Sequence, residues 1–190
     1  MKTKNTNKSG FTIIEVVLVL AIAGLIFMMV FIAYPALRRS QRDTQRQNDV
    51  SRLMTAIQNY QSNNRGALPK ASAVYDTTGA YIRGHSKVGN EANGTWAYFY
   101  DNYLLVGSNG AADVFTDPDG TDYNLQIVDC ENEGDKCTRQ VAGSFAEQAH
   151  NIMIITKAVC DGETVKPSNG DRNIAVAYKK EGGGVICQAL

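Results

Sequence analysis

One carboxylate, that of Glu15, lies near the start of an otherwise uncharged apolar stretch. Residues 16–34 are nineteen residues without a charge, and about 20 such residues cross the hydrocarbon core of a bilayer. An ionised side chain at that depth costs on the order of 3 kcal/mol. Glu15 therefore either pairs with a cation in a low dielectric or lies at the headgroup level, where its charge costs little.

The residues around this stretch favour a retained membrane segment over a secretory signal peptide. The first ten residues are polar, carry three lysines and end at Gly10. A signal peptide would have a small-residue cleavage site after its apolar core, but residues 22–24 run on into further apolar residues. We expect a single membrane-spanning helix.

Residues 8–15, KSGFTIIE, resemble the processing site of type IV pilins and pseudopilins, which has a short basic leader, Gly, Phe, and Glu at the fifth place after the cut. In that family a prepilin peptidase cuts between the positions of Gly10 and Phe11 and methylates the new amine. The resemblance covers about the first 65 residues. It implies that the Phe11 amine of one subunit neutralises Glu15 of a neighbour, which selects the stagger between helices more than it adds stability.

The resemblance also implies an α+β pilin fold with three parts. Residues 1–10 form a cleaved leader peptide, and residues 11–65 form a long helix that is transmembrane to about residue 37 and then amphipathic. Residues 66–190 form a globular loop and antiparallel β-sheet domain with a C-terminal disulfide loop. Two helix breakers, Gly24 and Pro35, lie in the long helix, where Pro35 should kink or loosen the preceding turn.

Apolar spacing indicates how the globular part packs. A stripe at helical spacing near the end of the long helix is predicted to face a sheet, and it consists of Val50, Leu53, Met54, Ile57 and Tyr60. A second amphipathic pattern predicts a short core helix with Trp96, Phe99, Tyr100, Tyr103 and Leu104. The strands of an antiparallel meander are expected at residues 122–130, 152–160, 173–180 and 184–189, after a connecting loop at residues 70–95.

Between residues 38 and 49 the predicted helix has no apolar face. Arg38, Arg42 and Arg46 recur at four-residue spacing, where like charges repel. One interpretation is a solvated helix with local ion pairs, Arg39 to Asp43 and Arg46 to Asp49. The second is that the arginines meet acidic groups of neighbouring subunits, and DNA binding is a less favoured third.

The four cysteines, Cys130, Cys137, Cys160 and Cys187, lack zinc-site spacing and favour disulfides. Disulfides require an oxidising compartment, which puts the C-terminal region outside the cytoplasm. Three pairings are possible, and we favour Cys130 with Cys137 and Cys160 with Cys187. The second pair resembles the C-terminal disulfide loop of many pilins.

An acidic turn at residues 117–123 is a candidate Ca²⁺ site. Asp117, Asp119 and Asp122 supply three carboxylates, and some pseudopilins carry a similar Asp-Pro-x-Gly turn beside a calcium site. Its glycine is at the fourth place instead of the sixth, so the turn is not an EF-hand loop. A plain β-turn with solvated acids is the alternative.

No nucleophile or phosphate-loop pattern accompanies the two histidines, and no enzymatic activity is predicted. Without the leader the chain has 16 basic and 19 acidic residues, and no specific nucleic-acid partner is expected. The resemblance implies a structural subunit, the major pilin, of an extracellular type IV pilus-like filament for adhesion, twitching motility or DNA uptake. Its partners would be identical subunits, the prepilin peptidase, the cytoplasmic membrane before assembly, and the assembly machinery. The alternatives are a pseudopilin or minor pilin of a secretion or competence apparatus, and a monomeric membrane-anchored ligand-binding domain.

Overall fold

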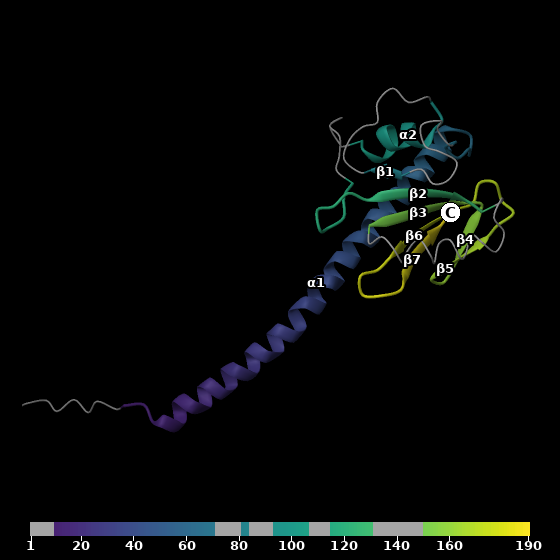
Figure 1. Cartoon of the computed structure of the whole chain (residues 1–190). Coiled ribbons are helices and arrows are strands. Elements are labelled where there is room, and N and C mark those ends of the chain that lie inside the picture. The colour runs from purple at the N-terminus through teal and green to yellow at the C-terminus, as the bar shows by residue number, and fades with distance from the viewer. Residues whose placement is uncertain (1–9, 71–80, 84–92, 107–114, 131–149) are drawn as a thin grey trace, which may run out of the picture. The chain divides into compact units, whose positions relative to one another are not determined.

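The structure, a computed structural model, describes residues 10–70, 81–83, 93–106, 115–130 and 150–190. The chain divides into two compact units, Met1–Ser40 and Gln41–Leu190. Helix α1 (Ile13–Asn63) contributes its first part to the first unit and its remainder to the second (Figure 1).

Helix α1 continues without interruption through Gly24 and Pro35. Pro35 cannot donate a backbone hydrogen bond, but the helix extends for several turns on either side of it. The helix ends where Arg65 and Gly66 adopt positive φ angles of 58° and 81°, and the Gly66 N–H donates to the Gln61 carbonyl at 2.7 Å. The helix predicted for residues 11–65 is thus present and two residues shorter at each end.

The part of α1 in the second unit buries an apolar stripe. Its five side chains are at most 6% exposed, and they are Val50, Leu53, Met54, Ile57 and Tyr60. They belong to one core cluster with alternate residues of two strands, namely Ile152, Ile154, Ile174, Val176 and Tyr178. The prediction that this stripe packs on a sheet is confirmed.

Within the described residues, five strands form the main sheet in the order β1-β2-β3-β6-β7 (Figure 1). Their bounds are β1 (Tyr81–Arg83), β2 (Asn124–Asp129), β3 (Asn151–Thr156), β6 (Ile174–Lys179) and β7 (Val185–Ala189). Neighbours pair antiparallel except β2 and β3, which are parallel. The predicted meander is wrong at this pair. Parallel strands need a connection of a dozen residues or more, which residues 130–150 supply.

The segment predicted as one strand at residues 152–160 is two strands. Lys157, with a φ of 55°, separates β3 from β4 (Ala158–Asp161), and β4 pairs with β5 (Thr164–Pro167), which was not predicted. This hairpin covers the sheet face opposite α1, in a second apolar cluster that includes Met153, Ile155, Ala158, Val165, Ala175 and Ala177. Burial of both faces explains why β3 and β6 are almost continuously apolar instead of alternating.

The predicted aromatic helix is present in two parts. Helix α2 (Trp96–Phe99) continues as the π-helical turn η1 (Tyr100–Leu104). The Thr95 side chain caps α2 by accepting the Tyr98 N–H at 3.2 Å. The ring centroids of Phe99 and Tyr60 lie 5.9 Å apart, which places this turn against α1. Core packing, the expected role of these aromatic residues, is confirmed.

Candidate functional site

A reciprocal cap between Thr12 and Glu15 begins helix α1. The Thr12 N–H and hydroxyl each donate to Glu15 Oε2 at 2.8 Å, and the Glu15 N–H donates to Thr12 Oγ1 at 3.4 Å. This capping box satisfies two N–H groups that the helix itself leaves unbonded. Glu15 therefore caps its own helix, a role that the sequence analysis missed although the Thr-x-x-Glu spacing at residues 12–15 signals it.

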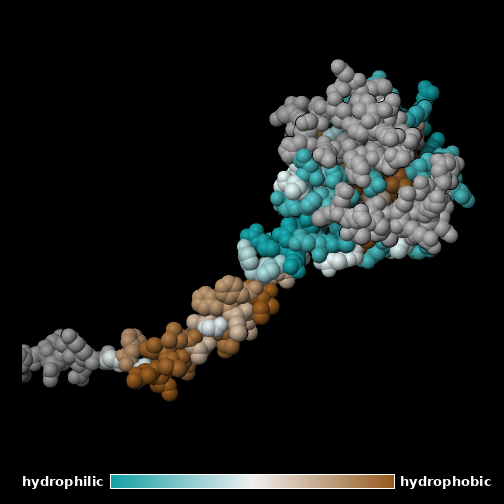
Figure 2. Space-filling view, viewed as in Figure 1, coloured by the Kyte–Doolittle hydropathy of each residue, from teal (hydrophilic) through white to brown (hydrophobic). Residues whose placement is uncertain are grey.

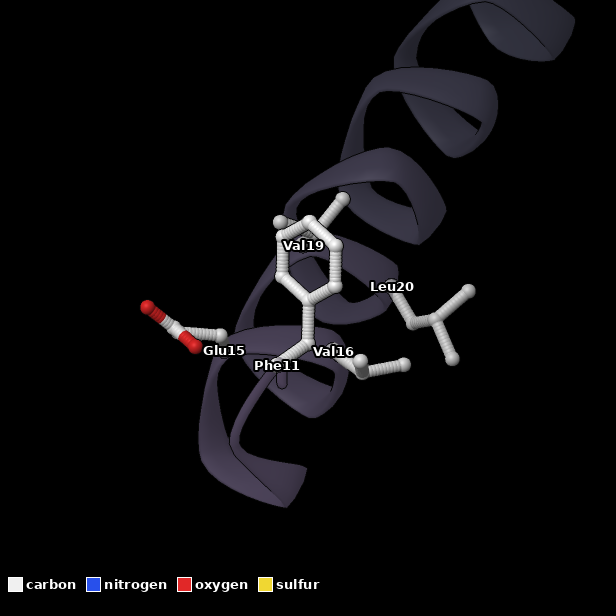
Figure 3. A pocket seen from close by; sticks show the side chains of 5 residues that line it. All are labelled: Phe11, Glu15, Val16, Val19 and Leu20. Atoms are coloured by element: carbon white, nitrogen blue, oxygen red, sulfur yellow. The ribbon is translucent and has the colours of Figure 1, made fainter. Parts of the chain in front are cut away.

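An open groove of about 510 Å³ lies beside this cap (Figure 3). Phe11, Val16, Val19 and Leu20 line it, and among the described residues Glu15 is the one polar residue of the lining. In Figure 3 the Phe11 ring overlaps Val19, and Glu15 and Leu20 point to opposite sides of the view. The Phe11 residue is 90% exposed. An aromatic ring, an apolar wall and a carboxylate thus lie together at the start of the helix.

The first unit exposes apolar side chains along its helix (Figure 2). From Phe11 to Ser40 every residue is exposed except Ala23, which is half-buried. Within the described chain, α1 is the one helix long and apolar enough to cross a membrane by length and composition. Water solvates such a surface at a cost of about 25 cal/mol per Å², so this surface favours lipid or other apolar helices.

Packing within the chain does not require Gly10 or Gly24. A Cβ atom at either position would meet no atom of the described residues within 4 Å, and neither glycine has a positive φ. Gly10 and Phe11 are both exposed, so the peptide bond between them is accessible to another protein.

A family model described as the prokaryotic N-terminal methylation motif matches residues 5–31. The chain carries a type IV pilin-like leader. The matched residues include Gly10, Phe11 and Glu15 and the first part of α1. Comparisons with curated proteins and with solved structures found no match. The pilin-like leader implies membrane insertion as a precursor, processing by a prepilin peptidase and assembly into a pilus-type system, and the proteins that share this motif are structural instead of enzymatic.

In the second unit, three residues of α1, Arg42, Asp43 and Arg46, form a charge cluster with Asp117 of the acidic turn and Glu181 of the turn between β6 and β7. Arg46 binds both carboxylate oxygens of Asp117, at 2.7 and 2.8 Å, and is 4% exposed. Arg42 Nε donates to Glu181 Oε2 at 2.7 Å. The Asp43 carboxylate accepts the N–H groups of Glu181 and Gly182, at 2.9 and 3.2 Å.

The contacts of Arg46 differ from the predicted local pair with Asp49, whereas the pair of Arg39 with Asp43 stays a prediction. Arg46 pairs with Asp117, 71 residues away, and not with Asp49, which instead accepts a hydrogen bond from the Tyr123 hydroxyl at 2.9 Å. Arg42 and Arg46 find acidic partners within their own globular unit, without a neighbouring subunit. The repulsion expected between the two arginines is thus offset by carboxylates of the β6–β7 turn and the acidic turn.

Electrostatics in the cluster follow from these contacts. The hydrogen bond from Arg42 holds the pKa of the Glu181 carboxyl below its ordinary value of 4.5. The hydrogen bonds to Asp117 raise the pKa of Arg46. Burial raises the pKa of Tyr178, whose ring lies 5.5 Å from the Arg46 guanidinium, and the neighbouring Asp117 carboxylate raises it further.

The acidic turn is a hydrogen-bonded β-turn in which Asp117 is fully engaged. The Gly120 N–H donates to the Asp117 carbonyl at 2.9 Å, and Gly120 has a φ of 90°. The Asp117 carboxylate accepts four hydrogen bonds, two from Arg46, one from the Tyr178 hydroxyl and one from the Asp119 N–H. These donors fill its roughly four acceptor positions, which disfavours Asp117 as a calcium ligand.

The structure places His150, and not Asp122, with the other two candidate ligands. One ligand atom each of Asp117, Asp119 and His150 lie within 4.8 Å of one another. The two imidazole nitrogens lie 3.7 Å from Asp117 Oδ2 and 3.6 Å from Asp119 Oδ2. Asp122 instead forms a β-bridge with Thr116. The calcium site at Asp117, Asp119 and Asp122 stays a prediction.

Cys160 and Cys187 form a disulfide, with Cα atoms 5.8 Å apart. It joins β4 of the covering hairpin to β7 at the edge of the main sheet, and this is the favoured pairing for these two residues. Cys137 lies outside the described residues, so the pairing of Cys130 with Cys137 stays a prediction.

Proposed function

We propose that the mature chain, beginning at Phe11, is a structural subunit of an extracellular type IV pilus-like filament built from many identical copies. The observation that carries the proposal is a processing motif placed directly before an exposed apolar helix that a membrane-embedded chain could present to copies of itself. Such a role needs no catalytic residue. The precursor would be held in the cytoplasmic membrane by α1, and the assembly machinery would move it into the filament.

The start of α1 supports a specific contact between copies. The cap uses Glu15 Oε2 for both hydrogen bonds from Thr12, and Oε1 takes part in neither. In a filament, Oε1 would accept the charged Phe11 amine of a neighbouring subunit. A pair buried among apolar helices is penalised when either charge lacks its partner, so it would favour one stagger between helices over others.

The role within a pilus system has two candidates. The exposed helix and its motif serve equally in a major pilin and in a pseudopilin or minor pilin, so cellular abundance separates them. We favour the major pilin, with adhesion, twitching motility or DNA uptake as the output. A membrane-anchored domain that binds its ligand as a monomer is the candidate from another class. In that case the exposed helix would contact only lipid.

The test compares filaments sheared from cells that produce the natural chain, Glu15→Ala or Glu15→Gln. We expect abundant filaments from the natural chain and at least tenfold fewer from both variants, because neither variant can balance the Phe11 amine. Equal membrane levels of the three precursors are the control for synthesis and insertion. Normal filaments of unchanged helical rise from Glu15→Ala would refute the register role, and the absence of filaments from the natural chain would favour the monomeric domain.

A further inference from the structure

Burial along α1 begins abruptly at Arg42. From Phe11 to Ser40 the residues are exposed, apart from half-buried Ala23, and both helix breakers, Gly24 and Pro35, lie in that part. Arg42 and Asp43 are half-buried and Arg46 is buried. The helix therefore has weak points only where its own chain gives it little packing, and the charge cluster stands at the start of the packed part.

The charge cluster joins one turn of α1 to the backbone and the side chains of the β6–β7 turn. Asp43 accepts two main-chain N–H groups, those of Glu181 and Gly182. Arg42 and Arg46 donate to the Glu181 side chain from the same helical turn. Because main-chain groups take part, the β6–β7 turn cannot move away from α1 without losing the hydrogen bonds that the Glu181 and Gly182 N–H groups donate to Asp43.

The two contacts to Glu181 require residues 42–46 of α1 to be helical. Arg42 Nε and Arg46 Nη1 both donate to the same atom, Glu181 Oε2, at 2.7 and 3.3 Å. Four residues advance about 6 Å in an α-helix but about 13 Å in an extended chain. Unwinding would pull the two guanidinium groups apart. Unwinding would also separate Arg46 from the Asp117 carboxylate. That carboxylate has no exposed surface, so water cannot replace the lost hydrogen bonds.

We propose that the charge cluster stops the unwinding of α1 at Arg42. When the chain enters a filament, the helix before Arg42 can bend or unwind at Gly24 and Pro35, whereas residues 42–63 stay helical and fixed to the sheet. The assembly step of this inference rests on the proposed function. The stop itself is a property of the single chain and is testable without a filament.

Amide hydrogen exchange of the full chain in detergent micelles tests the stop, with Asp43→Ala compared with Gln45→Ala. Gln45 is an exposed residue of the same helical turn, and both variants introduce alanine, so neither loses helix propensity. We expect exchange in residues 41–49 to be at least tenfold faster in Asp43→Ala than in Gln45→Ala, with residues 50–63 unchanged. Arg42→Gln, which removes a different contact to the same turn, should act in the same direction.

Two exchange results would overturn the proposal. Equal rates in Asp43→Ala, Arg42→Gln and Gln45→Ala would mean that the cluster does not hold the turn. Equal acceleration of residues 41–49 and 50–63 would mean that it stabilises the whole domain and not one boundary. In filaments resolved at the level of residues, a break in the helix between Arg42 and Arg46 would also overturn it, whereas a failure to form filaments would count against the proposed function and leave the exchange result standing.

Discussion

Arg46 and Asp117 form a bidentate ion pair at 2.7 and 2.8 Å across 71 residues of sequence, with side chains that are 5% and 0% exposed. The pair fixes the acidic turn to the middle of α1. Buried pairs of this kind add little net stability compared with apolar residues, but the loss of one partner leaves the other charged and dry. The pair therefore determines where α1 packs against the acidic turn more than it adds to the stability of the fold.

The first prediction tests whether the Arg46–Asp117 pair determines the packing of α1 without adding net stability. Arg46→Met should lower the free energy of unfolding by about 3–5 kcal/mol, because Asp117 is left as an unpaired buried carboxylate. Chemical unfolding of the full chain in detergent measures it. The double variant Arg46→Met/Asp117→Leu should regain most of the loss. A loss below about 1 kcal/mol in the single variant, or no recovery in the double variant, would contradict the account.

The second prediction concerns pH and Glu181. Its folded-state pKa lies below the ordinary value of 4.5, so its contribution is fully present above pH 4.5 and is lost as the pH falls through the folded-state pKa. We expect Glu181→Gln to lower the Tm by about 2 °C at pH 7 and to match the natural chain well below pH 4. Melting curves at both pH values measure this. A Tm difference that grows on acidification would have the wrong sign.

The third prediction tests the cap on α1. Thr12→Val removes the hydroxyl that bonds Glu15, and amide exchange at Glu15 and Val16, whose N–H groups donate to Thr12, should become about fivefold faster, in line with the loss of an N-cap. Residue-resolved exchange by NMR in micelles measures it. Thr12→Ser keeps the hydroxyl and is the matched control. If these amides exchange at the same rate in Thr12→Val and Thr12→Ser, the cap does not stabilise the start of the helix.

The fourth prediction addresses calcium. Because the Asp117 carboxylate already accepts four hydrogen bonds, millimolar Ca²⁺ and a chelator should leave the Tm of the full chain unchanged. A Ca²⁺-dependent rise of several degrees that Asp122→Asn abolishes would instead support the site at Asp117, Asp119 and Asp122.

The fifth prediction concerns the Cys160–Cys187 disulfide, which ties the covering hairpin to β7. The double variant Cys160→Ser/Cys187→Ser should lose about 3 kcal/mol of stability, since the bond closes a 27-residue separation. Exposure of Met153 and Ile155 should accompany the loss, and the binding of a dye specific for apolar surface would report it. Unchanged stability with unchanged dye binding would show that the hairpin stays in place without the bond.

Local periodicity predicted the parts of the fold that local physics decides. The stripe from Val50 to Tyr60 recurs at the helical period and could only be buried on one face, and the Glu181 to Gly184 turn chemistry marked the β6–β7 hairpin. The β2–β3 pairing could not be predicted, since a strand has the same two-residue period whether its neighbour is parallel or antiparallel. The break at Lys157 left no Gly or Pro in the sequence to signal it.

The candidate site divides in the same way. The Thr12–Glu15 cap depends on residues three apart, so the sequence contained it. The partners of Arg42 and Arg46 lie 139 and 71 residues away, and sequence spacing alone offers only neighbours three or four residues along the helix. Tertiary packing determines these long-range ion pairs, and sequence spacing cannot predict them.

The intact mass and N-terminal peptide map of the chain in material sheared from its host cells test the central claim most directly. The account predicts a chain that begins at methylated Phe11, found in a high-molecular-weight filament, with the Cys160–Cys187 disulfide formed. A chain that still begins at Met1 and stays in the membrane fraction would contradict it.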